Sequence, residues 1–77
     1  MLAYTLNSMR MEDYKTVLYR QENGWVAEIS AIPGCYALME TRESALAELT
    51  NVFEVIAEEY RKKPQPLPAD TTEIVTA

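Results

Sequence analysis

The chain has 77 residues, 48% of them hydrophobic and 25% charged, which is typical of one small globular domain and argues against disorder. Twelve acidic residues against seven basic ones give a formal net charge of −5. Binding to nucleic acid through phosphate contacts needs clustered Lys and Arg, so we expect no direct nucleic-acid partner. An acidic protein is better suited to a basic protein partner.

The cellular location is indicated by the cysteine content and by the N-terminus. Cys35 is the single cysteine, so no disulfide can form within one chain, as is usual in a reducing compartment. The start, MLAYTLNSMR, lacks the basic and long apolar regions of a signal peptide. No run approaches the roughly 18 apolar residues of a membrane span. These features predict a cytoplasmic protein without a membrane partner.

The N-terminal segment 1–11 allows two interpretations. Residues 3–6 (AYTL) could form a short strand. The segment could instead be an N-terminal extension, because Met9 and Met11 are both alternative starts. We expect the whole chain, residues 1–77, to be a single domain under either interpretation.

Two β-rich runs flanking a turn predict an antiparallel hairpin. Residues 14–20 (YKTVLYR) are rich in β-branched and aromatic side chains, and residues 25–32 (WVAEISAI) follow as a second strand. Asn23-Gly24 between them tolerates the positive φ angles that tight hairpin turns demand. In the second strand, alternation gives a buried face of Trp25, Ala27, Ile29 and Ala31, and a more exposed face of Val26, Glu28 and Ser30.

Pro33 and Gly34 end the second strand, since proline lacks a ladder donor and glycine admits unusual backbone angles. Residues 35–40 (CYALME) are then expected to form a third strand. Thr41 follows as the N-cap of a long helix over residues 42–62. Apolar residues recur along this helix at steps of three and four: Leu46, Leu49, Phe53, Ile56 and Tyr60. This stripe should pack on the inner face of the hairpin.

Prolines at positions 64, 66 and 68 end the helix. Residues 71–75 (TTEIV) could form a final strand at the sheet edge or remain a frayed tail. The predicted class is α+β: a small antiparallel sheet in β-β-β-α-β order, with one helix packed on one face.

No arrangement of residues indicates catalysis, so we expect no enzyme activity, no cofactor and no metal. The chain has no histidine, and Cys35 is best interpreted as a small structural residue after a turn. Glu28, Glu40 and Asp13 are not joined by a carboxylate motif, and the two glycines cannot make a phosphate-binding loop. Four aromatic residues could form a base-stacking platform for RNA: Tyr14, Tyr19, Trp25 and Tyr36. Packing against the core or against cross-strand neighbours is the stronger interpretation.

Several segments in a fixed order carry a family pattern. After Tyr14 come NGWVAE at residues 23–28, IPGC at 32–35, ETRESAL at 40–46 and PLP at 66–68. This ordered set resembles the N-terminal domain of HicB-like antitoxins over roughly residues 12–75. The positions shared with that family mark its fold: Gly24, Pro33, Gly34, Cys35, Thr41 and Ala45. No partner-binding residues are assigned by the resemblance. The family often has Glu at the position of Ser44, where it completes a reciprocal capping box.

The resemblance implies a partial RNase-H-like fold that lacks the catalytic acids of that enzyme fold. It also implies that the protein neutralises a small basic RNA-cleaving toxin by masking its active surface. Full antitoxins usually continue into a DNA-binding domain, whereas this sequence stops at Ala77. We therefore expect a stand-alone N-terminal domain here. The alternative is an orphan domain that self-assembles and binds another protein or a small ligand. A homo-oligomer, with a dimer first, is expected because a small core and an open sheet edge favour association.

Overall fold

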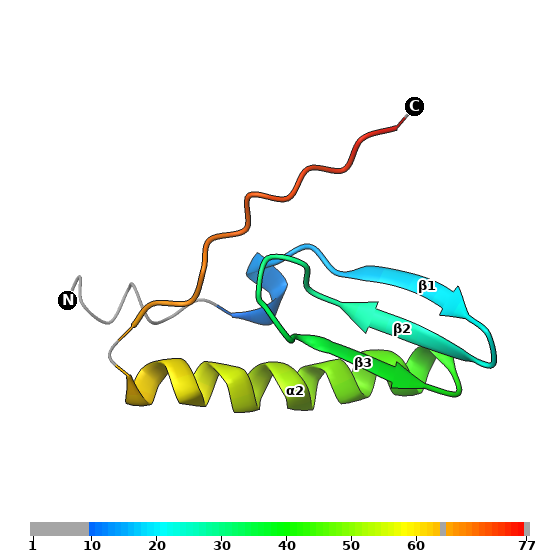
Figure 1. Cartoon of the computed structure of the whole chain (residues 1–77), viewed down its shortest axis with the longest axis horizontal. Coiled ribbons are helices and arrows are strands. Elements are labelled where there is room, and N and C mark those ends of the chain that lie inside the picture. Colours follow the sequence, from blue (N-terminus) through cyan, green and yellow to red (C-terminus); the bar gives the residue numbers. More distant parts are fainter. Residues whose placement is uncertain (1–9, 64, 77) are drawn as a thin grey trace.

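The computed structural model describes residues 10–63 and 65–76. A 3₁₀ turn, η1 (Met11–Asp13), precedes three strands and one long helix: β1 (Val17–Gln21), β2 (Gly24–Glu28), β3 (Tyr36–Met39) and α2 (Arg42–Lys62). The strands form one antiparallel sheet in the order β1-β2-β3, and α2 packs on β2 and β3 (Figure 1). The α+β class and the β-β-β-α order are therefore confirmed. The strand considered at residues 3–6 lies outside the described residues.

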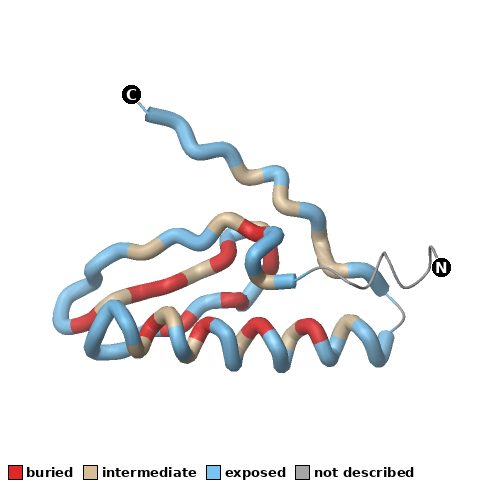
Figure 2. The backbone as a smooth tube through the Cα atoms, turned by 180° about the vertical axis from the view of Figure 1, so that it is seen from behind, coloured by how far each residue is buried: buried red, intermediate tan, exposed pale blue. Residues whose placement is uncertain are grey.

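The core lies between α2 and the sheet (Figure 2). The helix contributes four residues that are at most 5% exposed and that recur at helical spacing: Ala45, Leu49, Phe53 and Ala57. Opposite them, Ala27 of β2 pairs with Ala37 of β3, and both are buried. Alanine at these neighbouring positions allows the helix to approach the sheet closely. The expected burial of Ala27 and Ile29 is confirmed, whereas Trp25 is only half-buried.

The strand ends differ from those expected, because apolar residues near them belong to irregular segments. Tyr14 does not begin β1; it follows η1, and its ring lies 6.0 Å from that of Phe53 in the core. The second strand ends at Glu28 rather than at residue 32. The connection between β2 and β3 is held by its own backbone hydrogen bonds. The Ile29 N–H donates to the Cys35 carbonyl (2.9 Å), and the Cys35 N–H donates to the Ile32 carbonyl (3.1 Å). These side chains are buried without strand pairing.

The β1–β2 hairpin uses its glycine in a way that the sequence did not indicate. Gln21 pairs with Gly24, so the loop residues are Glu22 and Asn23, and the positive φ (50°) is at Glu22. Gly24 begins β2, where an added Cβ would lie 2.7 Å from the carbonyl oxygen of Met39. The prediction that Gly24 supplies a positive φ in the turn is wrong. Its lack of a side chain is needed because the end of β3 passes too close.

Replacing Gly24 with alanine should therefore lower the free energy of unfolding by about 1–3 kcal/mol, the usual cost of forcing a methyl group into packed structure. The control is Asn23→Ala, at the exposed neighbouring position, which should change it by less than about 0.5 kcal/mol. Urea denaturation at one protein concentration measures both variants. Equal stability of Gly24→Ala and the natural protein would show that β3 shifts freely.

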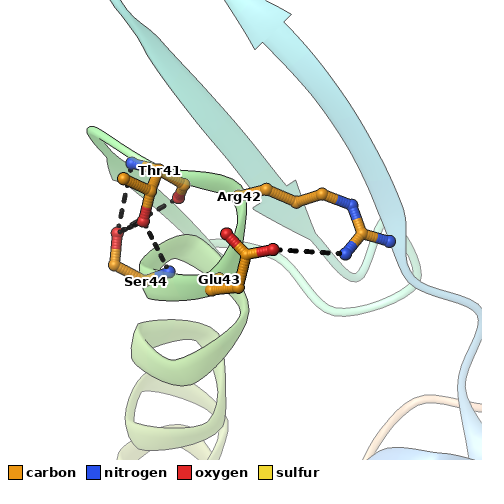
Figure 3. A network of polar contacts seen from close by, with 4 residues as sticks. All are labelled: Thr41, Arg42, Glu43 and Ser44. Atoms are coloured by element: carbon orange, nitrogen blue, oxygen red, sulfur yellow. Dashed lines mark hydrogen bonds and ion pairs between the residues drawn. The ribbon is translucent and has the colours of Figure 1, made fainter.

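A reciprocal capping box closes the N-terminus of α2 (Figure 3). The Ser44 N–H donates to Thr41 Oγ1 at 3.0 Å, and the Thr41 N–H donates to Ser44 Oγ at 3.2 Å. Thr41 is thus the N-cap that the sequence predicts. Ser44 closes the box in place of the longer glutamate of the related pattern. The adjacent Arg42–Glu43 ion pair, at 3.9 Å and exposed, adds little in water.

Thr41→Ala should lower the free energy of unfolding by about 1 kcal/mol, because it removes the acceptor for a helix N–H group. Ser44→Ala should also lower it, because the change removes the Ser44 Oγ that accepts the Thr41 N–H and that also contacts Thr41 Oγ1 (2.7 Å) and the Thr41 carbonyl oxygen (3.1 Å). Ser44→Glu should restore the bond to the Thr41 N–H. Thermal unfolding followed by circular dichroism measures all three. If Ser44→Glu is as unstable as Ser44→Ala, the box at this helix accepts only a short side chain.

After α2 the chain continues as an extended tail, residues 65–76, which leaves the body of the domain (Figure 1). Residues 65–76 contain no strand, so the last strand of the expected β-β-β-α-β order is not formed. Ile74 and Val75 are each 80% exposed. Of the two alternatives that the sequence left open for this segment, the tail is the one observed. The physical reason is a set of polar contacts at Asp70, described below.

Candidate interaction surface on the open sheet face

The sheet face that points away from α2, here called the open face, is the candidate functional site. Strand alternation places on it every second residue of each strand. Its members are Val17, Tyr19 and Gln21 of β1, Gly24, Val26 and Glu28 of β2, and Tyr36 and Leu38 of β3. The strand register aligns them in two main cross-strand rows, Tyr19–Val26–Leu38 and Val17–Glu28–Tyr36. The site is therefore a product of strand pairing.

Large apolar side chains on the open face remain in contact with solvent. Tyr36 is 61% exposed, Leu38 56% and Tyr19 42%. Val26, at the centre, is only 5% exposed although it faces away from the helix, because its neighbours on β1 and β3 flank it. The sequence placed Val26 on the correct face but predicted too much exposure. Contiguous exposed apolar side chains of this kind are typical of protein interaction sites.

A single carboxylate, Glu28, stands within this apolar surface. The Tyr19 hydroxyl donates to Glu28 Oε1 at 3.2 Å, and the Ser30 hydroxyl donates to Oε2 at 3.3 Å. Partial desolvation, followed by the hydrogen bond to Glu28, raises the pKa of Tyr19. The two donors orient the carboxylate, which can then receive a basic side chain from a partner.

Two open hollows adjoin each other on this face and share Gln21 and Leu38. One, of about 290 Å³, also contains Tyr19, Val26, Glu28 and Tyr36. The other, of about 410 Å³, lies at the hairpin end, between residues 21–24 and residues 38–40. Both are shallow and open to solvent, which suits a protein surface better than an enclosed small molecule.

The positions shared with the related family lie mostly away from the open face. Only Gly24 belongs to it. Pro33 and Gly34 are in the β2–β3 connection, where Gly34 has a φ of 78°, and Thr41 caps α2. Cys35 and Ala45 are 2% and 0% exposed, and burial raises the pKa of the Cys35 thiol. The structure thus brings together a different set of residues from those that the sequence motif marks.

Neither a metal cluster nor a membrane-spanning helix occurs in the described part of the chain. Among residues 10–63 and 65–76, no three His, Cys, Asp or Glu side chains are grouped so as to hold a metal ion. No helix in these same ranges is long and apolar enough to cross a membrane.

Asp70, which no sequence signal singled out, ties the tail to the start of β1. Its Oδ2 accepts the Lys15 backbone N–H at 2.6 Å and lies 3.5 Å from Lys15 Nζ, and its Oδ1 accepts the Thr72 N–H at 2.9 Å. Nearby, the Tyr14 hydroxyl donates to the Pro68 carbonyl at 2.6 Å. The Lys15 N–H first, then Thr72 and the Lys15 charge, hold the pKa of Asp70 well below its usual range.

Since the folded pKa of Asp70 is depressed, its contribution to stability is complete above the unfolded value, near 4, and is lost as the pH falls further. Asp70→Asn should therefore be less stable than the natural protein at pH 7, and the difference should narrow below about pH 4. Thermal unfolding between pH 2.5 and 7 measures this. Glu54→Gln, on the exposed side of α2, is the control. A difference between Asp70→Asn and the natural protein that stays constant with pH would contradict the assignment.

The architecture defines the class as a small α+β domain with one helix on one face of a three-stranded sheet. No family model and no solved structure matches the chain. UPF0150 protein ssl0259 of Synechocystis sp. is 41% identical over 63 residues, 80% of this chain and 86% of that protein. UPF0150 protein Ta0767 of Thermoplasma acidophilum is 27% identical over 64 residues, which cover 82% of this chain and 93% of that protein. The chain therefore belongs to the UPF0150 family.

Proposed function

We propose that this protein is an antitoxin-like protein that binds a small basic RNA-cleaving toxin and masks its active surface. It acts by binding alone, without catalysis and without a cofactor. The observation that carries the proposal is the open face, where exposed aromatic and aliphatic side chains surround an oriented carboxylate at Glu28. The resemblance to HicB-like antitoxins supports the choice of partner.

The charge and the surface chemistry both suit such a partner. A net charge of −5 attracts a basic protein over a distance and speeds the encounter. Tyr36 and Leu38 then offer apolar anchors, which usually supply most of the affinity at an interface. Glu28 offers an acceptor for Lys or Arg. A protein that cleaves RNA must present basic residues to phosphate groups, so a partner bound here would have those residues occupied.

The test is co-expression with a short basic protein encoded beside this chain, where the genome carries such a gene. Growth arrest caused by that protein should be relieved by the natural chain. Leu38→Asp, which places a charge in the apolar part of the open face, should weaken binding at least tenfold and lose the rescue. The matched control is Val55→Asp, since Val55 is similarly exposed (65% against 56%) but lies on α2. Calorimetry on the purified proteins gives the affinities.

The proposal is wrong if the natural chain neither binds that basic protein nor relieves the arrest. Equal losses for Leu38→Asp and Val55→Asp, with both variants folded, would place the contact elsewhere than on the open face. Circular dichroism shows whether each variant is folded.

An orphan domain that self-assembles is the second candidate function. One observation favours it: the tail exposes two adjacent large apolar residues, Ile74 and Val75, each 80% exposed. The presence or absence of a neighbouring gene for a short basic protein separates the two candidates.

A further inference from the structure

We propose that residues 71–76 of the tail add as a strand to the outer edge of β1 in a second copy of this chain, so that two copies exchange tails. This interaction does not depend on the toxin-binding role, because it uses the sheet edge and leaves the open face uncovered.

The tail has the composition of a β-strand, although it pairs with no strand of its own chain within the described residues. Five of the six residues 71–76 are β-branched, and the exception is Glu73. Ile74 and Val75 are adjacent, so in an extended chain they point to opposite sides. Both are 80% exposed, although the tail is held firmly at its base by Asp70. Such a segment is stable as a strand only when a sheet edge receives it.

The contacts of Asp70 turn the tail away from β1 of its own chain. A parallel pairing with that strand would begin beside Lys15, but the Lys15 N–H is already bonded to the Asp70 side chain. The same carboxylate accepts the Thr72 N–H, an Asx turn that bends the chain at that point. The tail accordingly departs from the sheet in both views (Figures 1 and 2). A second copy can supply the sheet edge that the tail does not use in its own chain.

The edge of β1 fits the tail in length and in charge. Within residues 10–63 and 65–76, β1 pairs only with β2, so its outer edge is open. Its five residues span about 17 Å and the six tail residues about 20 Å. Arg20 in β1 carries a positive charge that complements Glu73 of an incoming tail. β3, by contrast, contains no basic residue that could pair with Glu73.

The apolar residues of the tail also fit the two sides of β1. Leu18 points to the helix side of the sheet and is half-buried, while Tyr19 points to the open face. A tail strand beside β1 would place Ile74 and Val75 on opposite sides, one next to each of these residues. The exchange is reciprocal, so it closes as a two-fold dimer and leaves no unpaired tail.

The experiment compares molar mass by light scattering coupled to size-exclusion chromatography. The natural chain should have about twice the 8.8 kDa mass of one chain. Ile74→Asp/Val75→Asp should have the mass of one chain at the same concentration. The control, Thr71→Asp/Thr76→Asp, adds the same charge at polar tail positions and should stay dimeric. A natural chain that is monomeric, or an Ile74→Asp/Val75→Asp variant that stays dimeric, would overturn the proposal.

Nuclear Overhauser contacts in a half-labelled sample then identify the acceptor edge. Contacts from the Ile74 methyl groups to Leu18 or Tyr19 should appear between labelled and unlabelled chains. If these contacts occur only within one chain, the tail pairs with its own β1 and the proposal is wrong. The monomeric tail variant should still relieve toxin arrest, so failure of this inference and failure of the antitoxin proposal are distinguishable.

Discussion

Close packing of one helix against one side of a three-stranded sheet is the constraint on which the rest of this structure depends. Small side chains make that contact, since Ala27 and Ala37 on the sheet and Ala45 on α2 are all at most 5% exposed. The capping box of Thr41 and Ser44 sets where the helix begins, and the missing side chain of Gly24 lets the end of β3 pass close to β2. Each of these features positions α2 and the strands as one unit.

A single helix can cover only one side of a sheet, and this has a direct consequence for function. The uncovered side carries tyrosine, leucine and valine instead of the polar residues that a solvated sheet face usually has. Burial of Val26 by its neighbours shows that these side chains already pack together on that side. Such a pre-formed surface can accept a partner at little cost in conformational entropy. Glu28 adds a charge that favours a basic partner.

The tail is a second place where apolar side chains are left exposed, on a different part of the molecule. Its base is bonded through Asp70 and Pro68, whereas its apolar end is exposed. The edge of β1 and the open face meet along the same strand but present different chemistry: backbone hydrogen-bonding groups at the edge, and side chains on the face. The two proposed interactions would therefore use different groups of the same domain.

The sequence by itself determined the three strands, the helix, the N-cap and the α+β class, because hydrophobic periodicity and capping chemistry are local properties. It also indicated which residues of β2 share a face. Only the tertiary structure decided the path of the tail, because the bonds from Asp70 to Lys15 join residues 55 positions apart. The same holds for Gly24, whose side-chain space is taken by a backbone oxygen of β3, and for the assembly of the open face from three strands. Pairing between neighbouring strands sets the rows of the open face, and the alternation within one strand does not reveal which residues of the next strand stand opposite.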